Sequence, residues 1–306
     1  MKTNGKIRIA ALVLCTIFNV QSFAQSSTVP EGALKGVFSV GNAKKVYFSK
    51  GNLQYQASTN TWRFAEKQTD IVGMDNKNIS ENYSGWIDLF SWATSGYSHG
   101  AKCYQPWSTS KNDNDYCANG QITNDLSGKA DWGYNAISNG GNMENQWRTL
   151  SGKEWLYLLN ERKTPSGIRF VYGKIGDSPG MIILPDDWDI AYCDLDNPNG
   201  GGSTRTMINQ FSVEEWQMLL EAHGAAFLPA AGLRDGTEIT DVNKIGRLFA
   251  VRGDYWSTSR GNSNHWSSNP NNIIFLSFSD GGGASVASFA GQRFYGRCVR
   301  LVRDVR

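Results

Sequence analysis

The sequence reads GDYWST at Gly253–Thr258, IIFLSF at Ile273–Phe278 and RFYGRCVRLVR at Arg293–Arg303. β-Branched and aromatic residues dominate these three runs, which is typical of buried strands. Between the first two runs lies Ser259–Asn272, a stretch of Ser, Asn, Arg, Gly, His and Trp with almost no aliphatic residue. Strands that frame a long polar loop are typical of a recognition module, in which a rigid frame presents a variable surface.

This loop supplies most of the candidate ligand-binding residues. Trp and His rings offer stacking faces, Asn side chains offer paired donors and acceptors, and Arg offers a planar fork for an acidic or carbonyl group. Such side chains suit sugars, and they also suit protein surfaces. The alternative is an ordinary polar connection with Trp266 packed beneath it. The candidate residues are Tyr255, Trp256, Arg260, Asn262, Asn264, His265, Trp266, Asn269, Asn271 and Asn272.

Residues 1–24 have the order of a secretory signal peptide. Lys2, Lys6 and Arg8 precede an apolar run, and small residues follow at Ser22 and Ala24. Cleavage would start the mature chain at Gln25, and residues 25–34 are expected to be a flexible segment. A lipid anchor at Cys15 is the weaker reading, because the bulky Leu14 precedes it. The sequence therefore predicts an exported protein, in the periplasm, on the cell surface or secreted.

Composition narrows the class of the mature chain. Charged residues make up 19% and aromatic residues 12% of 306 residues, with 33 Gly and 11 Trp. This composition fits a β-rich fold with many turns. Loss of three basic leader residues takes the formal charge from +2 to −1, so we expect no nucleic-acid partner. No internal apolar run reaches the roughly 18 residues of a membrane helix, so no transmembrane segment is expected in the mature chain.

Four cysteines remain after the predicted cleavage, an even number that in an oxidising compartment predicts disulfides. Cys103 and Cys117 bracket a polar loop, and we favour a bond between them. Cys193 and Cys298 are left as a long-range pair. Four cysteines allow three pairings, and the sequence does not choose among them. Zinc binding is disfavoured because no two cysteines have the short spacing of a zinc site.

Short β-prone runs separated by turns predict hairpins at the start of the mature chain. They are Gly36–Val40, Lys45–Ser49, Asn52–Gln56 and Thr61–Phe64. Residues 69–145 follow, with little periodicity but many Trp and Tyr residues, which indicates ordered and packed loops rather than a linker.

Two helices are predicted by the same signature. Ser151 and Ser212 each precede a Glu by three residues, which is the pattern of a capping box. Trp155 and Trp216 each begin an apolar stripe with Leu residues three and four positions later. Gly224 is placed to end the second helix in a left-handed conformation. A buried strand is expected after each helix, at Met181–Pro185 and Ala225–Pro229.

Several motifs, taken together and in order, resemble secreted gut-bacterial paralogous families with a C-type-lectin-like fold, of the FISUMP major paralogous domain kind. They are KVYFSKGNLQY at Lys45–Tyr55, NQWRTL at Asn145–Leu150, EW at Glu154–Trp155, ILPDDW at Ile183–Trp188, FLPAAG at Phe227–Gly232, YWS at Tyr255–Ser257 and VRLV at Val299–Val302. Similar folds occur in formylglycine-generating enzymes and in variable proteins diversified by retroelements.

This resemblance implies an α+β fold with two helices, a small twisted antiparallel sheet and long loops. It implies one domain over residues 35–304, with a hairpin and long-loop part (35–145) and a two-helix part (146–304). It also implies that the two ends of the domain pair, so Arg297–Arg303 is expected to lie beside Lys45–Gln56. Val299 and Leu301 would then face the core together.

The search for catalytic chemistry finds little. A formylglycine-generating enzyme needs a cysteine pair near the C-terminus, where Cys298 stands alone. The three histidines are His99, His223 and His265, which are far apart and in no metal spacing. No nucleotide fingerprint or nucleophile elbow is present. We therefore expect a binding module that is not an enzyme and has no cofactor. The alternatives are a catalytic member of the formylglycine-generating superfamily and a surface adhesin or appendage subunit.

Calcium is the remaining candidate ion. Sugar-binding C-type lectins hold it with runs such as Glu-Pro-Asn and Trp-Asn-Asp, since calcium needs several hard oxygens. Neither Gln105–Trp107 nor the residues after Trp266 match such a run. Asp113–Asp115 and Asp194–Asn197 offer oxygens but are equally typical of turns, so a structural calcium stays an open alternative. The identity of a glycan or protein ligand is not encoded in any motif.

Overall fold

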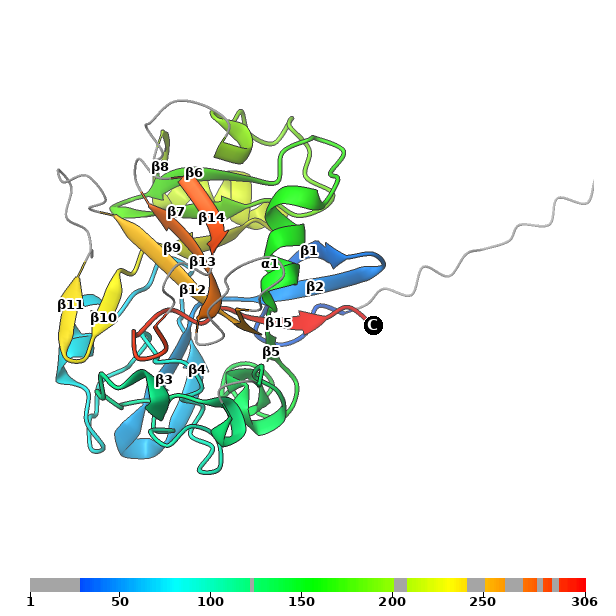
Figure 1. The fold of residues 1–306 in the computed structure, drawn as a ribbon. Helices are drawn as coiled ribbons and strands as arrows, with labels where there is room; N and C mark the ends of the chain where they lie inside the picture. Colours follow the sequence, from blue (N-terminus) through cyan, green and yellow to red (C-terminus); the bar gives the residue numbers. More distant parts are fainter. Residues whose placement is uncertain are drawn as a thin grey trace, which may run out of the picture.

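A computed structural model describes residues 28–121, 124–200, 208–240, 251–261, 272–279, 283–287 and 292–306. Small sheets dominate, and the helices are few and short, so the protein is α+β as expected. Figure 1 shows one sheet at the top, a hairpin with long loops at the bottom, and the other sheets between them. β1 already begins at Ala33, so the last residues of the segment expected to be flexible are in a strand. The predicted leader lies outside the described residues.

The central sheet joins segments from the start and the end of the domain. Its order is β1 (Ala33–Gly41), β2 (Lys44–Ser49), β15 (Leu301–Asp304) and β5 (Arg148–Thr149), all antiparallel. Val302 lies opposite Phe48 in the β2–β15 pair. The Leu53 N–H donates to the Val299 carbonyl at 2.9 Å. Val299 and Leu301 are both fully buried in one core cluster. The predicted pairing of the two ends is confirmed.

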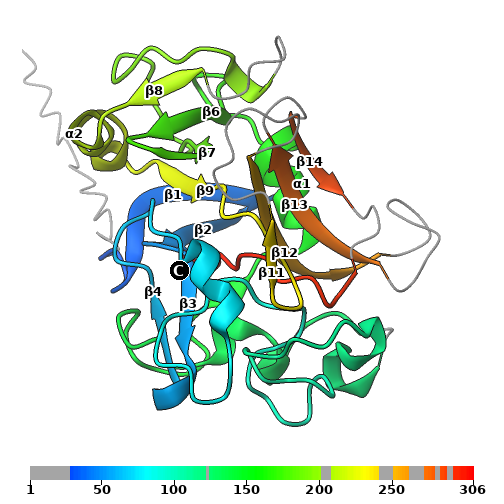
Figure 2. The same cartoon turned by 90° about the vertical axis from the view of Figure 1, so that its left-hand side faces the viewer.

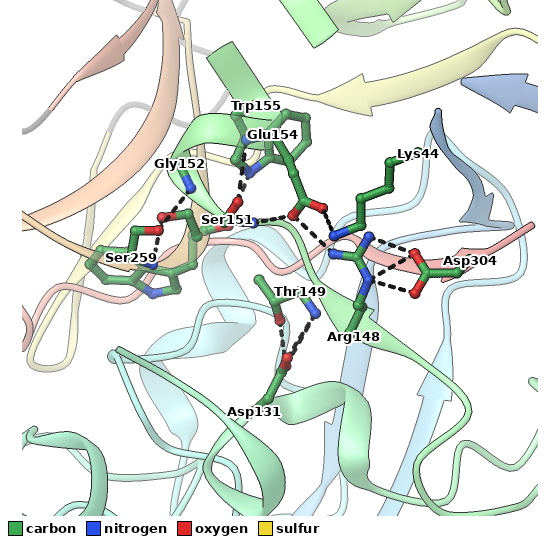
Figure 3. A network of polar contacts seen from close by, with 12 residues as sticks. Lys44, Asp131, Arg148, Thr149, Ser151, Gly152, Glu154, Trp155, Ser259 and Asp304 are labelled. Carbon is green, nitrogen blue, oxygen red and sulfur yellow. Dashed lines mark hydrogen bonds and ion pairs between the residues drawn. The ribbon is translucent and has the colours of Figure 1, made fainter. Parts of the chain in front are cut away.

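A polar network fixes the end of this sheet to the first helix (Figure 3). The Arg148 guanidinium donates to Glu154 Oε2 at 2.9 Å and to Asp304 Oδ1 at 2.7 Å. Lys44 Nζ lies 2.6 Å from Glu154 Oε1. The Glu154 side chain is only 9% exposed. Salt therefore screens its ion pairs with Arg148 and Lys44 less than it screens pairs between two exposed side chains. The network therefore fixes β2, β5 and β15 relative to the helix.

Both capping boxes form. Ser151 precedes α1 (Gly152–Leu156), and Ser212 precedes α2 (Val213–Glu215). Each Ser side chain accepts from the backbone N–H of the Glu three residues later, and the carboxylate of that Glu accepts from the Ser backbone N–H. Each helix continues as a π turn, η7 (Tyr157–Glu161) or η9 (Trp216–Leu220). A 3-10 turn, η10 (Glu221–His223), follows η9 and ends at Gly224 with φ +87°, as predicted. Among the described residues, no helix is both long and apolar enough to cross a membrane.

Two further sheets complete the half of the domain that contains the helices (Figure 2). One has the order β8 (Asn209–Phe211), β6 (Phe170–Ile175), β7 (Ser178–Ile183) and β9 (Ala226–Pro229). The other is β12 (Arg252–Arg260), β13 (Ile273–Ser279) and β14 (Gly283–Ala287). A small hairpin, β10 (Leu233–Asp235) with β11 (Glu238–Thr240), lies beside them, and a 3-10 turn, η8, covers Pro198–Gly200. The strands predicted after each helix correspond to β7 and β9.

The other half is a hairpin surrounded by loops. β3 (Leu53–Gln56) pairs with β4 (Thr61–Phe64), as the sequence predicts. The loops that follow contain no strand within their described residues up to 147, yet Trp92 and Trp132 in them are fully buried. The loops are therefore packed into a core, as expected. Their only regular elements among described residues are 3-10 turns, η1 (Ala57–Thr59) in the hairpin and then η2 (Gly73–Asn78), η3 (Asp113–Asp115), η4 (Ala118–Gly120), η5 (Gly128–Ala130) and η6 (Trp132–Tyr134).

The cysteine pairing predicted from the sequence is not formed in this structure, in which the four described cysteines are free thiols. Cys298 is buried in the core beneath β1 and β2, whereas Cys193 packs against the separate core of the β6–β9 sheet. The Cys103 thiol points to Asp115 Oδ2 at 3.6 Å, and the Cys117 thiol points to the Asn114 carbonyl at 3.5 Å. Each sulfur therefore has surroundings of its own instead of another sulfur.

Candidate functional site

The two aromatic residues predicted to begin the recognition surface are in the interior instead. Tyr255 and Trp256 on β12 are both 0% exposed. The Tyr255 hydroxyl donates to the Pro229 carbonyl at 2.7 Å, and Trp256 Nε1 donates to the Phe90 carbonyl at 2.6 Å. Both faces of β12 are covered, because Tyr255 belongs to one core cluster and Trp256 to the next. These residues therefore hold the two halves together and do not contact an external ligand.

The two ends of the predicted recognition loop are tied to the frame. The Arg260 N–H donates to Asp125 Oδ1 at 2.9 Å, and the Gly261 N–H donates to the Asn272 carbonyl at 2.5 Å. Arg260 and Asn272 are both partly exposed. The other six candidates lie outside the described residues, and their role stays a prediction. They are Asn262, Asn264, His265, Trp266, Asn269 and Asn271.

A polar groove with a volume of about 360 Å³ opens at the tip of the β3–β4 hairpin. Four segments that are distant in sequence build it: the hairpin tip, the turn at residues 81–82, Gly96 and the loop at 104–107. The Gly96 N–H donates to the Tyr104 carbonyl at 3.0 Å, and a Gln105–Ser108 turn is closed at 2.9 Å. The lining residues are Tyr55, Ala57, Ser58, Asn60, Glu81, Asn82, Gly96, Tyr104, Gln105, Pro106 and Trp107.

Two stacked rings form the aromatic part of the groove. The rings of Tyr55 and Trp107 lie 6.2 Å apart with an interplanar angle of 14°. Tyr55 is 3% exposed, and burial raises its pKa to about 12. Its hydroxyl therefore stays protonated at neutral pH and donates to Asn60 Oδ1 at 3.0 Å. This bond orients the Asn60 amide at the hairpin tip, where the backbone is left-handed with φ +51°.

Beside these rings lie polar side chains that have no protein partner among the described residues. Within the part of the chain that the structure describes, no hydrogen bond or ion pair engages the side chains of Glu81, Asn82, Tyr104 and Gln105. Together they offer a carboxylate, two amides and a phenol, which can donate and accept. In the sequence, Tyr104 and Trp107 are two of the many aromatic residues that indicate packed loops. Gln105–Trp107 was considered only as a calcium-binding run, which it does not match. The clustering of Tyr, Gln and Trp at 104–107 was the available signal.

A larger cavity of about 600 Å³ lies beside α1 and is lined by Val40, Gly41, Lys153, Glu154, Leu156, Tyr157 and Glu161. Its most buried charged group, Glu154, is already engaged by Arg148 and Lys44. The rest of the lining combines two aliphatic side chains, Val40 and Leu156, with Lys153, Tyr157 and Glu161. This cavity offers fewer groups to orient a polar ligand than the hairpin groove does.

The described residues include no cluster of three or more His, Cys, Asp and Glu side chains that could hold a metal ion. The Asp113–Asp115 segment is a 3-10 turn in which Asn112 caps the Asn114 N–H. Asp115 accepts from Ser110 at 2.7 Å and lies 3.3 Å from Lys102 Nζ. Its oxygens are therefore already used, as the turn interpretation of this segment expects.

Buried titratable groups are the usual candidates for catalysis, but those described here lie in the cores. Cys298 is 1% exposed, and burial raises its thiol pKa well above the ordinary value. A buried protonated thiol is a poor nucleophile. Burial likewise raises the pKa of Asp88 to about 6. Asp88 accepts from the Val72 N–H and from Asn76 Nδ2, both at 2.8 Å.

Asp88 should make the protein more stable in mild acid. Its pKa rises from 3.8 to about 6 on folding, so between about pH 4 and 6 the native state holds a proton that the unfolded chain has released. Stability therefore falls as pH rises through this window, by on the order of 2–3 kcal/mol. Urea unfolding at about pH 4 and about pH 7.5 should show this loss of stability, and the loss should be smaller in Asp88→Asn. An equal loss in both proteins would contradict the assignment.

Comparisons with protein-family models, with curated proteins and with solved structures found no match to this chain.

Proposed function

We propose that this protein is an exported, non-enzymatic binding module with a C-type-lectin-like fold, and that it recognises a glycan in the groove at the tip of the β3–β4 hairpin. The observation that carries the proposal is the stacked Tyr55–Trp107 pair beside polar side chains that have no partner in the described part of the chain. The paired ends, the two capped helices and the long packed loops support the fold.

The chemistry of a sugar matches both parts of this groove. A pyranose ring has an apolar face of C–H groups, which packs on an aromatic ring, and a rim of hydroxyls, which donate and accept hydrogen bonds. Trp107 supplies the aromatic platform, while Asn60, Asn82 and Gln105 supply amides. The volume of about 360 Å³ is near the lower end of ligand pockets, roughly 300–1,000 Å³. A short glycan end fits this size better than a folded protein does.

Replacement of Trp107 should remove glycan binding. An array of neutral oligosaccharides probed with the protein should give signals that Trp107→Ala lowers by roughly fivefold to thirtyfold or more, because loss of an anchoring aromatic residue costs on the order of 1–2 kcal/mol or more. Asn82→Ala, at an exposed position, should lower the signals without a change in melting temperature. This second variant separates a loss of binding from a loss of packing around Trp107.

Trp86→Ala is the matched control. Trp86 is also partly buried, but Arg63 lies over its ring at 3.7 Å. Arg63 is opposite Gln54, and side chains alternate along a strand, so this pair is on the other face of the hairpin from Tyr55. Trp86→Ala should therefore keep the signals. Absence of any array signal would contradict glycan recognition. Signals that survive both groove substitutions would place the site elsewhere, with Ser259–Asn272 as the next candidate.

A further inference from the structure

The distribution of charge around the hairpin groove narrows the class of glycan, provided that the proposed function holds. Among the described residues that line the groove, Glu81 is the only charged one, and it is exposed at the rim. The remaining polar side-chain groups are three amides, one hydroxyl, two phenols and one indole N–H. Arg and Lys bind the carboxylate or sulfate of an acidic sugar most strongly, because their hydrogen bonds are charge-assisted. No lining residue supplies such a group.

Two cationic side chains of the neighbouring segments, Lys102 and Arg63, are engaged elsewhere, and the exposed Lys77 does not line the groove. Lys102, two residues before Tyr104, lies 3.3 Å from Asp115 Oδ1. Arg63 donates to Gln54 Oε1 at 2.9 Å and lies over the Trp86 ring, on the opposite face of the hairpin. Neither side chain lines the groove. A carboxylate entering the groove would therefore meet the charge of Glu81 without compensation.

We infer that the groove selects against acidic glycans and favours sugars that carry a protonated amine, with Glu81 as the specificity-determining residue. A free amine beside Glu81 forms an ion pair, a neutral sugar hydrogen-bonds to the same carboxylate, and a uronic acid is repelled by it. The ion pair would be exposed, and exposed ion pairs contribute only modestly to affinity. Glu81 therefore changes the affinity for a charged sugar by a factor of up to about five per charge. Trp107 and the amides supply the remaining affinity.

Three tetrasaccharide probes test this inference: glucosamine, N-acetylglucosamine and galacturonic acid. The protein should bind the glucosamine probe more tightly than the galacturonic acid probe. Glu81→Gln should reduce the ratio of these two affinities by about threefold to fivefold, and Glu81→Lys should reverse the preference. The N-acetylglucosamine probe carries no charge, so its affinity should change least. Added salt should reduce the difference between the charged probes, because it screens exposed charges.

Glu144→Gln is the matched control, since it removes the same charge at an exposed position outside the groove. It should leave the ratio unchanged. An equal ratio in the protein, Glu81→Gln and Glu81→Lys would overturn the inference. If the neutral probe then still depends on Trp107, glycan recognition itself would stand. If no probe binds to the protein at all, the proposed function fails along with the inference.

Discussion

A chain that ends at Arg300 is expected to lose cooperative folding. This truncation removes β15, which lies between β2 and β5 in the central sheet. Leu301 and Val302 are fully buried and belong to two different core clusters, so both cores are opened at once. Asp304 is also lost, which takes one carboxylate from Arg148. Thermal unfolding followed by circular dichroism should show no sigmoidal transition.

A chain that ends at Asp304 is the control for this truncation. It keeps every residue of β15 and the ion pair with Arg148. It loses only the hydrogen bond from the Val305 N–H to the Lys45 carbonyl, together with the side chains of Val305 and Arg306. Such a bond contributes about 1 kcal/mol, so a cooperative transition should remain. If the chain ending at Arg300 unfolded as cooperatively as this control, β15 would not be integral to the fold.

Trp256→Ala should lower the free energy of unfolding by about 3–5 kcal/mol, as for other large buried aromatic residues. The ring is 0% exposed, and the Arg297 guanidinium lies over it at 4.3 Å. The substitution leaves a cavity beneath that guanidinium and deprives the Phe90 carbonyl of the indole N–H that lies at 2.6 Å. Urea unfolding measures the loss.

Trp256→Phe separates the two contributions. It keeps most of the ring volume but removes the N–H, so it should cost about 1–3 kcal/mol for the carbonyl left unsatisfied. At low temperature, where both variants remain folded, glycan binding should match that of the unsubstituted protein, because Trp256 does not line the groove. A loss of binding without a loss of stability would return Trp256 to the recognition surface and contradict its structural role.

The elements that were predicted correctly from the sequence are those that depend on a few consecutive residues. In each hairpin, short β-prone runs are separated by turn residues, and each capping box spans four residues. Pairing of the last strand with the first hairpin followed from the resemblance to a family, and Val299 and Leu301 are buried as that pairing requires. The C-type-lectin-like identity of the fold stays a proposal.

The predictions that failed depend on tertiary packing. Tyr255 and Trp256 are consecutive, and one of two consecutive strand residues normally faces outward. Here cores lie on both sides of β12, so neither does. An even number of cysteines gives no information on spatial proximity, and the four sulfurs proved to be separate. The hairpin groove was not predicted because its residues come from four segments without periodicity, which only the folded chain brings together.

The position of β15 also determines when the fold can form during translation. β1 and β2 are made early, but β15, the other neighbour of β2, is complete only after the ribosome has passed residue 304. Domains generally fold once their whole sequence is available, and non-local pairing is slow. Until then the β2 edge and the apolar faces that β15 covers stay open to chaperones or to aggregation. Nascent chains stalled before Leu301 should therefore be readily cleaved by proteases, whereas released chains should become resistant.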